Sequence, residues 1–235
     1  MTNPASALTG VESLGLSATR SDLPHFGVPF EVAFAGFPEH IQTVPANVLA
    51  ALGNARKDYE AITGAAEAVA DAFGAVDKDR GLSEAGRTAA RAALAEKVFN
   101  QYLGAANGLE VGERLAGERT FTVKRDALQA AQAEYGEQAL EIRAYLASLS
   151  EAERRTKVEM ALAKQDRSVM FALVTAPTVY GFDPDLREQA TSALVGLMAP
   201  DDVAITETLV AALALPRGAQ RELARWLRDQ VALLA

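Results

Sequence analysis

Cysteine is absent from this chain of 235 residues, and histidine occurs only twice. The lack of cysteine excludes disulfide bonds, thiolate nucleophiles and sulfur-ligated metal sites, and it fits a reducing compartment. Aromatic residues make up 6% of the chain although 49% of it is apolar. Much of the apolar content is alanine, which favours helices. No apolar run is long enough to span a membrane, and no secretory signal is recognisable. We therefore expect a helical protein that is cytoplasmic when made and has no membrane partner.

Basic residues are also too few to balance the acidic ones. The chain has 23 lysines and arginines against 31 aspartates and glutamates, which gives a net charge of -8. This balance argues against nucleic acid as a partner of the whole surface, because neutralising phosphates requires clustered lysine and arginine. A local basic patch is still compatible with it.

The usual catalytic signatures are missing as well: no nucleophile elbow, P-loop, dinucleotide fingerprint or zinc-binding helix motif occurs. His25 and His40 are too few for a catalytic zinc site, which needs three fixed ligands. The acidic turn Asp77–Gly81 fails the spacing of a calcium loop, because its glycine stands fifth and Thr88 occupies the place of the bidentate glutamate. We expect a non-enzymatic protein with no cofactor and no metal site.

Residues 1–45 form a separate segment, the N-terminal arm. It holds five of the nine prolines and one basic residue, and it has no helical periodicity. Alternating apolar residues from Val28 to Ala35 predict a strand, and Arg119 to Lys124 is the best candidate for its partner in a small two-stranded β element. An equally weighted alternative is that the phenylalanines of the arm lie along the helical body as an extended strap. Arms of this kind bury their aromatic residues on a neighbouring subunit, so we expect these side chains to form an assembly interface: Phe26, Phe30, Phe34 and Phe37.

The strongest pattern in the chain is an apolar seam in an unbroken 4-3 rhythm. It consists of Val48, Leu52, Ala55, Tyr59, Ile62, Ala66, Val69, Phe73 and Val76. A repeat of 3.5 residues leaves one narrow stripe to be covered, so this helix should pack lengthwise against another helix. The pattern predicts a helix from Ala46 to about Ala75, with Leu49 off the seam.

Two further helices continue this bundle. Ser83 is a suitable N-cap for the second, whose seam is mostly small: Ala85, Thr88, Ala92, Ala95, Phe99, Tyr102, Ala106 and Leu109. A large-residue seam opposite a small-residue seam predicts an antiparallel hairpin. The third helix runs from about Val123 to Leu149, with a seam of Leu128, Ala131, Tyr135, Ile142, Tyr145 and Leu149.

The remaining boundaries come from capping residues. Ser150 and Glu153 form a capping box that opens a fourth helix to about Thr175, and we assign residues 46–176 to a long-helix antiparallel bundle.

The C-terminal part, residues 177–235, is expected to be a subdomain of shorter helices. Asp183 as N-cap, with Pro184 at the first helical position, starts a fifth helix that ends near Ala199. Two more helices follow, the last of them opened by Pro216. The fold class is therefore mainly α.

The last helix carries the most suggestive surface. Four arginines share one stripe at 4-4-3 spacing: Arg217, Arg221, Arg225 and Arg228. The opposite face is apolar: Leu223, Trp226, Leu227, Val231 and Leu234. The functional interpretation is contact with phosphate, an acidic partner or an acidic surface of a neighbouring copy. The alternative, which we favour, is a solvated face partly neutralised by Glu222 and Asp229. Trp226 is expected to anchor the core.

A helical body without catalytic residues, a proline- and phenylalanine-rich arm and a basic helix on an acidic protein together favour a subunit that assembles. Our hypothesis is a non-enzymatic structural protein, repeated in a larger particle such as a tailed-phage virion as a connector, adaptor or capsid-associated component. Its partners would be copies of itself and other subunits, contacted through the arm. The second hypothesis is a cytoplasmic helical binding module whose arginine-lined last helix docks an acidic partner or nucleic acid.

Overall fold

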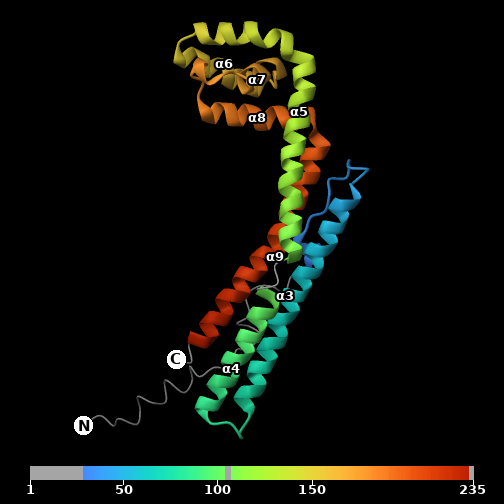
Figure 1. Ribbon diagram of the computed structural model, residues 1–235, viewed down its shortest axis with the longest axis vertical. Helices are drawn as coiled ribbons and strands as arrows, with labels where there is room; N and C mark the ends of the chain where they lie inside the picture. The colour runs from blue at the N-terminus through green and yellow to red at the C-terminus, as the bar shows by residue number, and fades with distance from the viewer. Residues whose placement is uncertain (1–28, 104–106, 233–235) are drawn as a thin grey trace, which may run out of the picture. The chain divides into compact units, whose positions relative to one another are not determined.

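The computed structural model of the protein describes residues 29–103 and 107–232, and every regular element within these ranges is helical (Figure 1). The α-helices are α2 (Phe30–Ala33), α3 (Ala46–Lys78), α4 (Glu84–Val98), α5 (Asn107–Ser148), α6 (Glu151–Ala163), α7 (Arg167–Val174), α8 (Pro184–Met198) and α9 (Pro200–Ala232). A π-helix, η3 (Phe99–Leu103), and a 3₁₀ helix, η4 (Thr178–Tyr180), complete the set. The prediction of a mainly α fold with long, antiparallel helices is confirmed.

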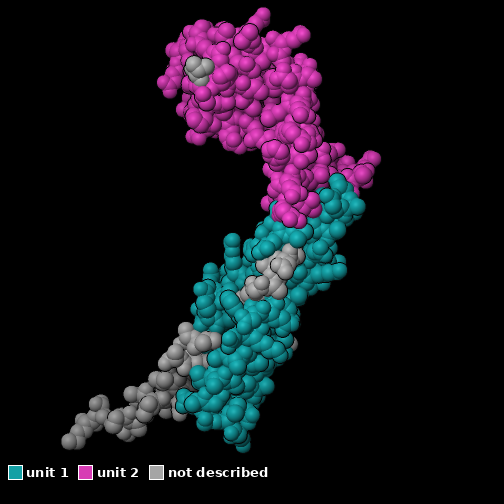
Figure 2. Space-filling model, in the orientation of Figure 1, with its two compact units in different colours: residues 1–36, 45–113, 211–235 teal, residues 37–44, 114–210 magenta. Residues whose placement is uncertain are grey.

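The chain divides into two compact units (Figure 2). Unit 1 comprises residues 1–36, 45–113 and 211–235, and unit 2 comprises residues 37–44 and 114–210. The limits fall inside α5 and α9, so each of these two helices contributes to both units. This division is not the same as the three consecutive segments proposed from the sequence, because residues distant in the chain join in each unit.

In unit 1, the seam of α3 is buried as predicted, from Val48 to Phe73, and only its last member, Val76, is half-buried. Leu49, the residue off the seam, is 52% exposed. Helices α3 and α4 pack against each other as a hairpin, and Ser83 caps α4 by accepting a hydrogen bond from the amide of Gly86 at 3.1 Å. The hairpin and its N-cap are therefore confirmed.

The small-residue seam predicted for the second helix is only partly buried. Ala95 and Leu109 are buried, but Ala85 and Phe99 are exposed, and the other described members are half-buried. Arg91, which is not a member of the seam, lies in the core with only 3% exposure. The guanidinium carbon of Arg91 lies 4.8 Å from the centroid of the Phe73 ring. A planar guanidinium stacks on an aromatic face, which allows Arg91 to be buried, whereas the neighbouring Ala92 of the predicted seam is only half-buried.

The predicted two-stranded β element is also wrong. Phe30 begins the short helix α2, where an i, i+4 spacing brings its ring to 5.4 Å from that of Phe34. The other proposed strand, Arg119 to Lys124, lies within α5. Burial at helical spacing outweighs local β propensity here, because Val123 is buried on the helix while Phe121 is 67% exposed.

Helix α5 starts at Asn107 rather than near Val123, and it buries one narrow stripe. The stripe consists of Leu109, Gly112, Ala116, Val123, Ala127, Ala131, Ala139 and Leu146. Tyr145 was expected on the seam but is 51% exposed, and Leu146 takes its place. The buried face of a straight α-helix drifts relative to a strict seven-residue repeat. Here the step from Ala131 to Ala139 is eight residues instead of seven, so the buried position moves by one residue, from Tyr145 to Leu146.

The fourth predicted helix is two helices. The capping box is confirmed, since Ser150 and Glu153 exchange both hydrogen bonds. The helix breaks well before Thr175, at Gln165, whose φ of 56° places it in the left-handed region. Asp166 then caps α7 by accepting hydrogen bonds from two amides of its first turn.

The reverse holds at the C-terminus, where two predicted helices are one. Asp183 and Pro184 start α8 as expected, but α9 continues through Pro216 for 33 residues. A proline inside a helix costs about 3 kcal/mol. Burial along α9 offsets this cost, through Leu209, Leu213, Pro216, Ala219 and Leu223. The expectation that every C-terminal helix is short is wrong for α9.

Three arginines of unit 2 bind backbone carbonyls at helix ends. Arg143 Nε donates to the carbonyl of Ala172 at 3.0 Å, and Arg187 Nη2 donates to that of Ala176 at 2.8 Å, both at the end of α7. Arg154 donates to two carbonyls at the end of α5. The last carbonyls of a helix have no partner within it, so these side chains stabilise the fold and are not available for a ligand.

Replacing Arg143 with leucine should lower the free energy of unfolding by about 1–3 kcal/mol, because the carbonyl at the end of α7 loses its donor. Arg155→Leu is the control, since Arg155 is exposed on α6 and forms a surface ion pair with Glu159 of the same helix; we expect a change within about 0.5 kcal/mol. Urea unfolding of the two variants measures the difference. Equal effects would show that the carbonyl contact adds nothing to stability.

Candidate basic surface on helix α9

The apolar face of α9 forms part of the core of unit 1, as predicted. Its described members are all buried: Leu223, Trp226 and Leu227. Trp226 stacks on Phe73 of α3, with 5.7 Å between ring centroids, so its predicted role as a core anchor is confirmed. Leu234 and the side chain of Val231 lie outside the described part of the chain. This packing orients the arginine stripe away from the core.

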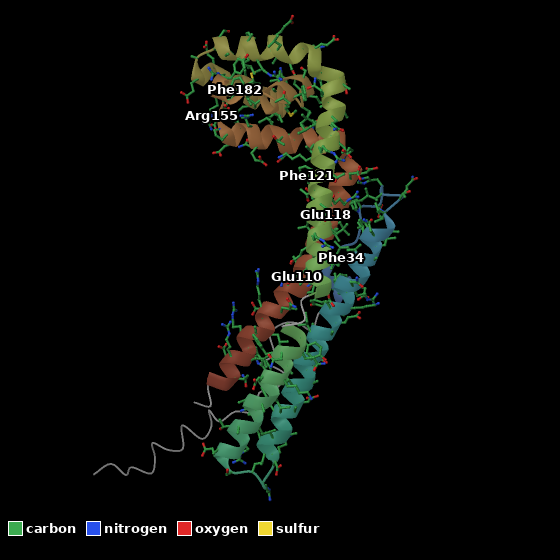
Figure 3. The ribbon with its side chains drawn as sticks, in the orientation of Figure 1. Phe34, Glu110, Glu118, Phe121, Arg155 and Phe182 are labelled. Atoms are coloured by element: carbon green, nitrogen blue, oxygen red, sulfur yellow. The ribbon has the colours of Figure 1, made fainter. Side chains whose placement is uncertain are left out.

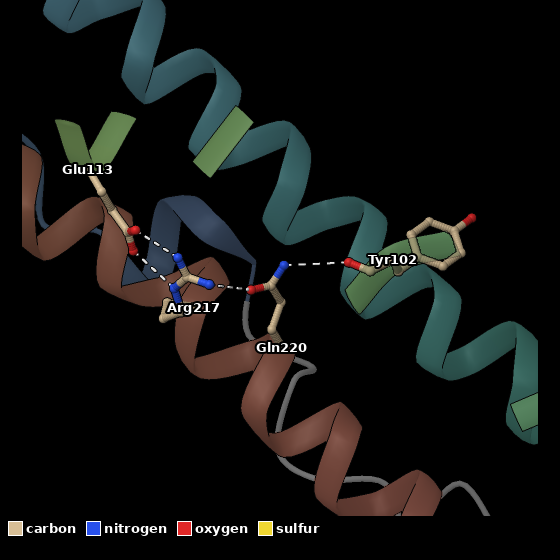
Figure 4. Close-up of polar contacts among 4 residues, drawn as sticks. All are labelled: Tyr102, Glu113, Arg217 and Gln220. Atoms are coloured by element: carbon tan, nitrogen blue, oxygen red, sulfur yellow. Dashed lines mark hydrogen bonds and ion pairs between the residues drawn. The ribbon is translucent and has the colours of Figure 1, made fainter. Parts of the chain in front are cut away.

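Arg217, the first member of the stripe, is held in a network within unit 1 (Figure 4). Its Nε and Nη2 donate to the two carboxylate oxygens of Glu113 on α5, at 2.9 Å and 2.7 Å. Its Nη1 donates to Gln220 Oε1 at 3.2 Å, and Gln220 Nε2 donates to the carbonyl of Tyr102 at 3.4 Å. A bidentate arginine–carboxylate pair has a fixed geometry. Arg217 is therefore a link between α9, α5 and η3.

The charges of this pair stabilise each other. The hydrogen bond from Arg217 lowers the pKa of the Glu113 carboxyl, and the positive charges of Arg217 and Arg221 act in the same direction. The hydrogen bond to Glu113 in turn raises the pKa of Arg217. Both groups are ionised at neutral pH.

The lowered pKa predicts how acid affects unit 1. A carboxyl whose pKa is lower in the folded state stabilises that state above its unfolded pKa, which is near 4.5 for glutamate. This contribution is lost as the pH falls from there through the folded pKa. Glu113→Gln should therefore destabilise the protein at pH 7, and the difference from the wild type should shrink toward about pH 3. Urea unfolding at both pH values measures it, and a difference independent of pH would contradict the assignment.

The other three arginines are exposed. Arg225 Nη1 lies 3.2 Å from Glu222 Oε2, a pair on the surface of the same helix. Arg228 Nε donates to the carbonyl of Ala224 at 3.2 Å. Within the described residues neither Arg221 nor Arg228 forms an ion pair with a carboxylate. Glu222 therefore neutralises one arginine, as the solvated-face interpretation expected, whereas Asp229 pairs with none of them among the described side chains.

A shallow depression lies beside this stripe. Its lining comes from η3, α5 and α9: Phe99, Glu113, Arg217, Gln220, Arg221 and Ala224. Phe99 is 48% exposed and supplies an apolar ring beside the guanidinium groups. Arginine donors beside an aromatic face suit carboxylates and phosphates, so the chemistry that this surface offers is anion binding.

The phenylalanines of the N-terminal arm have different positions from one another. Phe26 lies outside the described residues. Phe30 is buried, with its ring 5.9 Å from that of Tyr59 on α3, and Glu31 forms an ion pair with Arg56 of the same helix. Phe34, labelled in Figure 3, and Phe37 are partly buried. The side chain of Phe30 therefore belongs to the chain's own core, as the strap interpretation has it.

Metal-binding chemistry has little support in the described ranges, where no group of three or more histidine, aspartate or glutamate side chains could hold an ion. His40 Nε2 lies 3.6 Å from Asp201 Oδ1 on the surface of unit 2, and His25 falls outside the described residues. Another depression, in unit 2, is lined in part by Arg154 and Phe182. The guanidinium of Arg154 lies over the Phe182 ring at 5.4 Å, and it donates hydrogen bonds to the carbonyls at the end of α5.

Glu113 and Gln220 could not be found by sequence reasoning. Glu113 is separated from Arg217 by 104 positions, and no local pattern marks it as a partner.

The helices themselves, over their described residues, include none that is long and apolar enough to cross a membrane. Comparison of the chain with protein-family models, with curated proteins and with solved structures found no match.

Proposed function

We propose that this protein is a non-enzymatic structural subunit that assembles with copies of itself, and with other subunits, into a larger particle. The observation that carries the proposal is the narrow packing of α5. Between Arg114 and Ala127 the buried residues are only Ala116, Val123 and Ala127, at spacings of seven and four residues. Phe121, labelled in Figure 3, is two-thirds exposed among them. A helix that uses one stripe in its own chain leaves the rest of its circumference for a partner, and an exposed aromatic ring is the type of residue that anchors interfaces.

The particle that we propose is a virion of the tailed-phage type, in which the protein would be a connector, adaptor or capsid-associated component. Its support is the combination of long alanine-rich helices with an arm rich in proline and phenylalanine. Because Phe30 is buried against Tyr59, the phenylalanines of the arm that are only partly buried among the described residues, Phe34 and Phe37, are the ones proposed for a contact between subunits.

Replacing Phe121 with aspartate should dissociate the assembly without unfolding the subunit. A charge placed at a contact that excludes water is left without a partner, whereas in the free subunit this position is mostly exposed. Gln129→Asp, at an exposed polar position of the same helix, should leave assembly unchanged. Sedimentation velocity measures size and circular dichroism measures folding. An unchanged particle size for Phe121→Asp would remove this face of α5 from the interface.

The second candidate function is a helical binding module that docks an acidic partner or nucleic acid on α9. The specific observation in its favour is the exposed stripe of Arg221, Arg225 and Arg228 beside Phe99. Binding of a fluorescent oligonucleotide or a polyglutamate peptide to the wild type, with the affinity falling as salt rises, would support it.

A further inference from the structure

The arginine stripe of α9 has a regular geometry. Arg221, Arg225 and Arg228 follow each other at spacings of four and three residues, so they lie on one face and span about 10 Å along the helix. All three are exposed, and among the described residues Arg225 forms an ion pair only with Glu222 of its own helix. The stripe is thus a row of three guanidinium groups at steps of about one helical turn.

A row of carboxylates with the same geometry lies on α5, in unit 2. Glu134, Glu137 and Glu141 are exposed and follow each other at spacings of three and four residues. Glu134 accepts a hydrogen bond from the hydroxyl of Tyr135 at 2.6 Å. No ion pair engages these three carboxylates within the described part of the chain. Three adjacent negative charges on one face repel each other and are stabilised by an opposite row.

We propose that the arginine stripe of α9 in one copy docks antiparallel on this acidic stripe of α5 in a second copy. This inference rests on the proposed function and names the contact by which the subunits associate. In the antiparallel direction the spacings coincide, so that Arg221 lies opposite Glu141, Arg225 opposite Glu137 and Arg228 opposite Glu134. A single register therefore pairs all three charges of each row.

The residues that flank the two rows fit the same register. Tyr145 follows Glu141 by one helical turn and is half-exposed, and in this register it lies opposite Arg217. Arg217 and Phe99 line the depression beside the stripe, so the tyrosine ring of one copy has an aromatic ring and a guanidinium to pack against. Paired charges then set the register, while the aromatic contact contributes buried apolar area.

The contact uses two different surfaces, so every copy has a basic face on α9 and an acidic face on α5. Such a heterologous interface produces rings or open chains of copies rather than only pairs. A second copy is a better occupant than nucleic acid, because its acidic row has the same spacing as the arginines, whereas the phosphates of a nucleic acid would also lie against the rest of a protein whose net charge is -8.

Charge exchange between copies tests the proposal. One variant carries R221E and R225E on α9, and the other carries E137R and E141R on α5. Each alone should associate about tenfold or more weakly than the wild type in low salt, because both charge pairs become repulsive. Mixed at equal concentration, the two variants should associate again, since the altered α9 of one then meets the altered α5 of the other. R80E with E67R, at exposed positions elsewhere in unit 1, is the matched control.

Sedimentation velocity at a low and a high salt concentration gives the sizes, and circular dichroism shows that each variant is folded. If the wild type associates but neither variant changes its size, or if the mixture stays dissociated, this contact is wrong while the proposed assembly stands. If the wild type itself is a monomer under all conditions, both proposals fail. Binding of an oligonucleotide that is lost only in the α9 variant, without recovery in the mixture, would assign the stripe to nucleic acid instead.

Discussion

Replacing Ile62 with aspartate should unfold unit 1. Ile62 lies in the middle of the α3 seam and is buried, so the new carboxylate would have neither water nor a partner. An unpaired buried charge costs about 3–5 kcal/mol or more, and the net stability of a folded domain is only about 5–15 kcal/mol. We expect loss of much of the helical circular dichroism, or a melting transition far below that of the wild type.

Leu49→Asp is the matched control for this substitution. Leu49 is on the same helix but is half-exposed, so its charge stays in water, and the melting temperature should change by only a few degrees. If Ile62→Asp melted like the control, α3 would face solvent at this position and the hairpin with α4 would be wrong.

Replacing Phe171 with alanine should have the largest effect in unit 2. Phe171 is fully buried on α7, in a cluster formed with residues of α5, α6 and α8. Truncating a buried phenylalanine removes its apolar contacts and leaves a cavity, which costs about 3–5 kcal/mol. Urea unfolding, followed by circular dichroism at a concentration where the protein is dispersed, measures this loss.

Phe121→Ala is the control with the same change of side chain. Its ring is mostly exposed on α5, so the free energy of unfolding should change by about 0.5 kcal/mol or less. Equal destabilisation by the two substitutions would mean that α7 is not the centre of this core.

The helices that were predicted well are those with a strong local signal. The α3 seam repeats large residues without interruption, and the caps at Ser83, Ser150 and Asp183 are confirmed by their hydrogen bonds. These features depend on neighbours within one or two turns, which sequence patterns record. Trp226 was recognised as a core residue for the same reason, since it lies on the apolar face of α9.

The features that sequence reasoning missed depend on distant contacts. Arg91 is buried because Phe73 offers it an aromatic face, and Pro216 stays inside α9 because burial on both sides outweighs the lost hydrogen bond. The break at Gln165 required recognition of Asp166 as an N-cap. Phe30 and Phe121 belong to segments in which large apolar residues recur at every second position, as in strands, yet both lie on helices.

The candidate surface was partly predictable. The spacing of Arg217, Arg221, Arg225 and Arg228 placed them on one stripe of the last helix, and three of them are exposed there. The sequence could not show that Arg217 is engaged by Glu113, since that carboxylate comes from α5. The fit between the arginine stripe and the carboxylates of α5 emerges only when the exposure of both helices is known.

The mass of the full-length chain in solution decides whether the protein assembles. Light scattering over a concentration series, in low and in high salt, measures it directly. We expect a discrete oligomer many times the 24.9 kDa of one chain, which becomes smaller as salt screens the charge pairs. A mass of one chain at every concentration and at both salt levels would contradict self-assembly, and the arginine stripe of α9 would then require a partner other than a second copy.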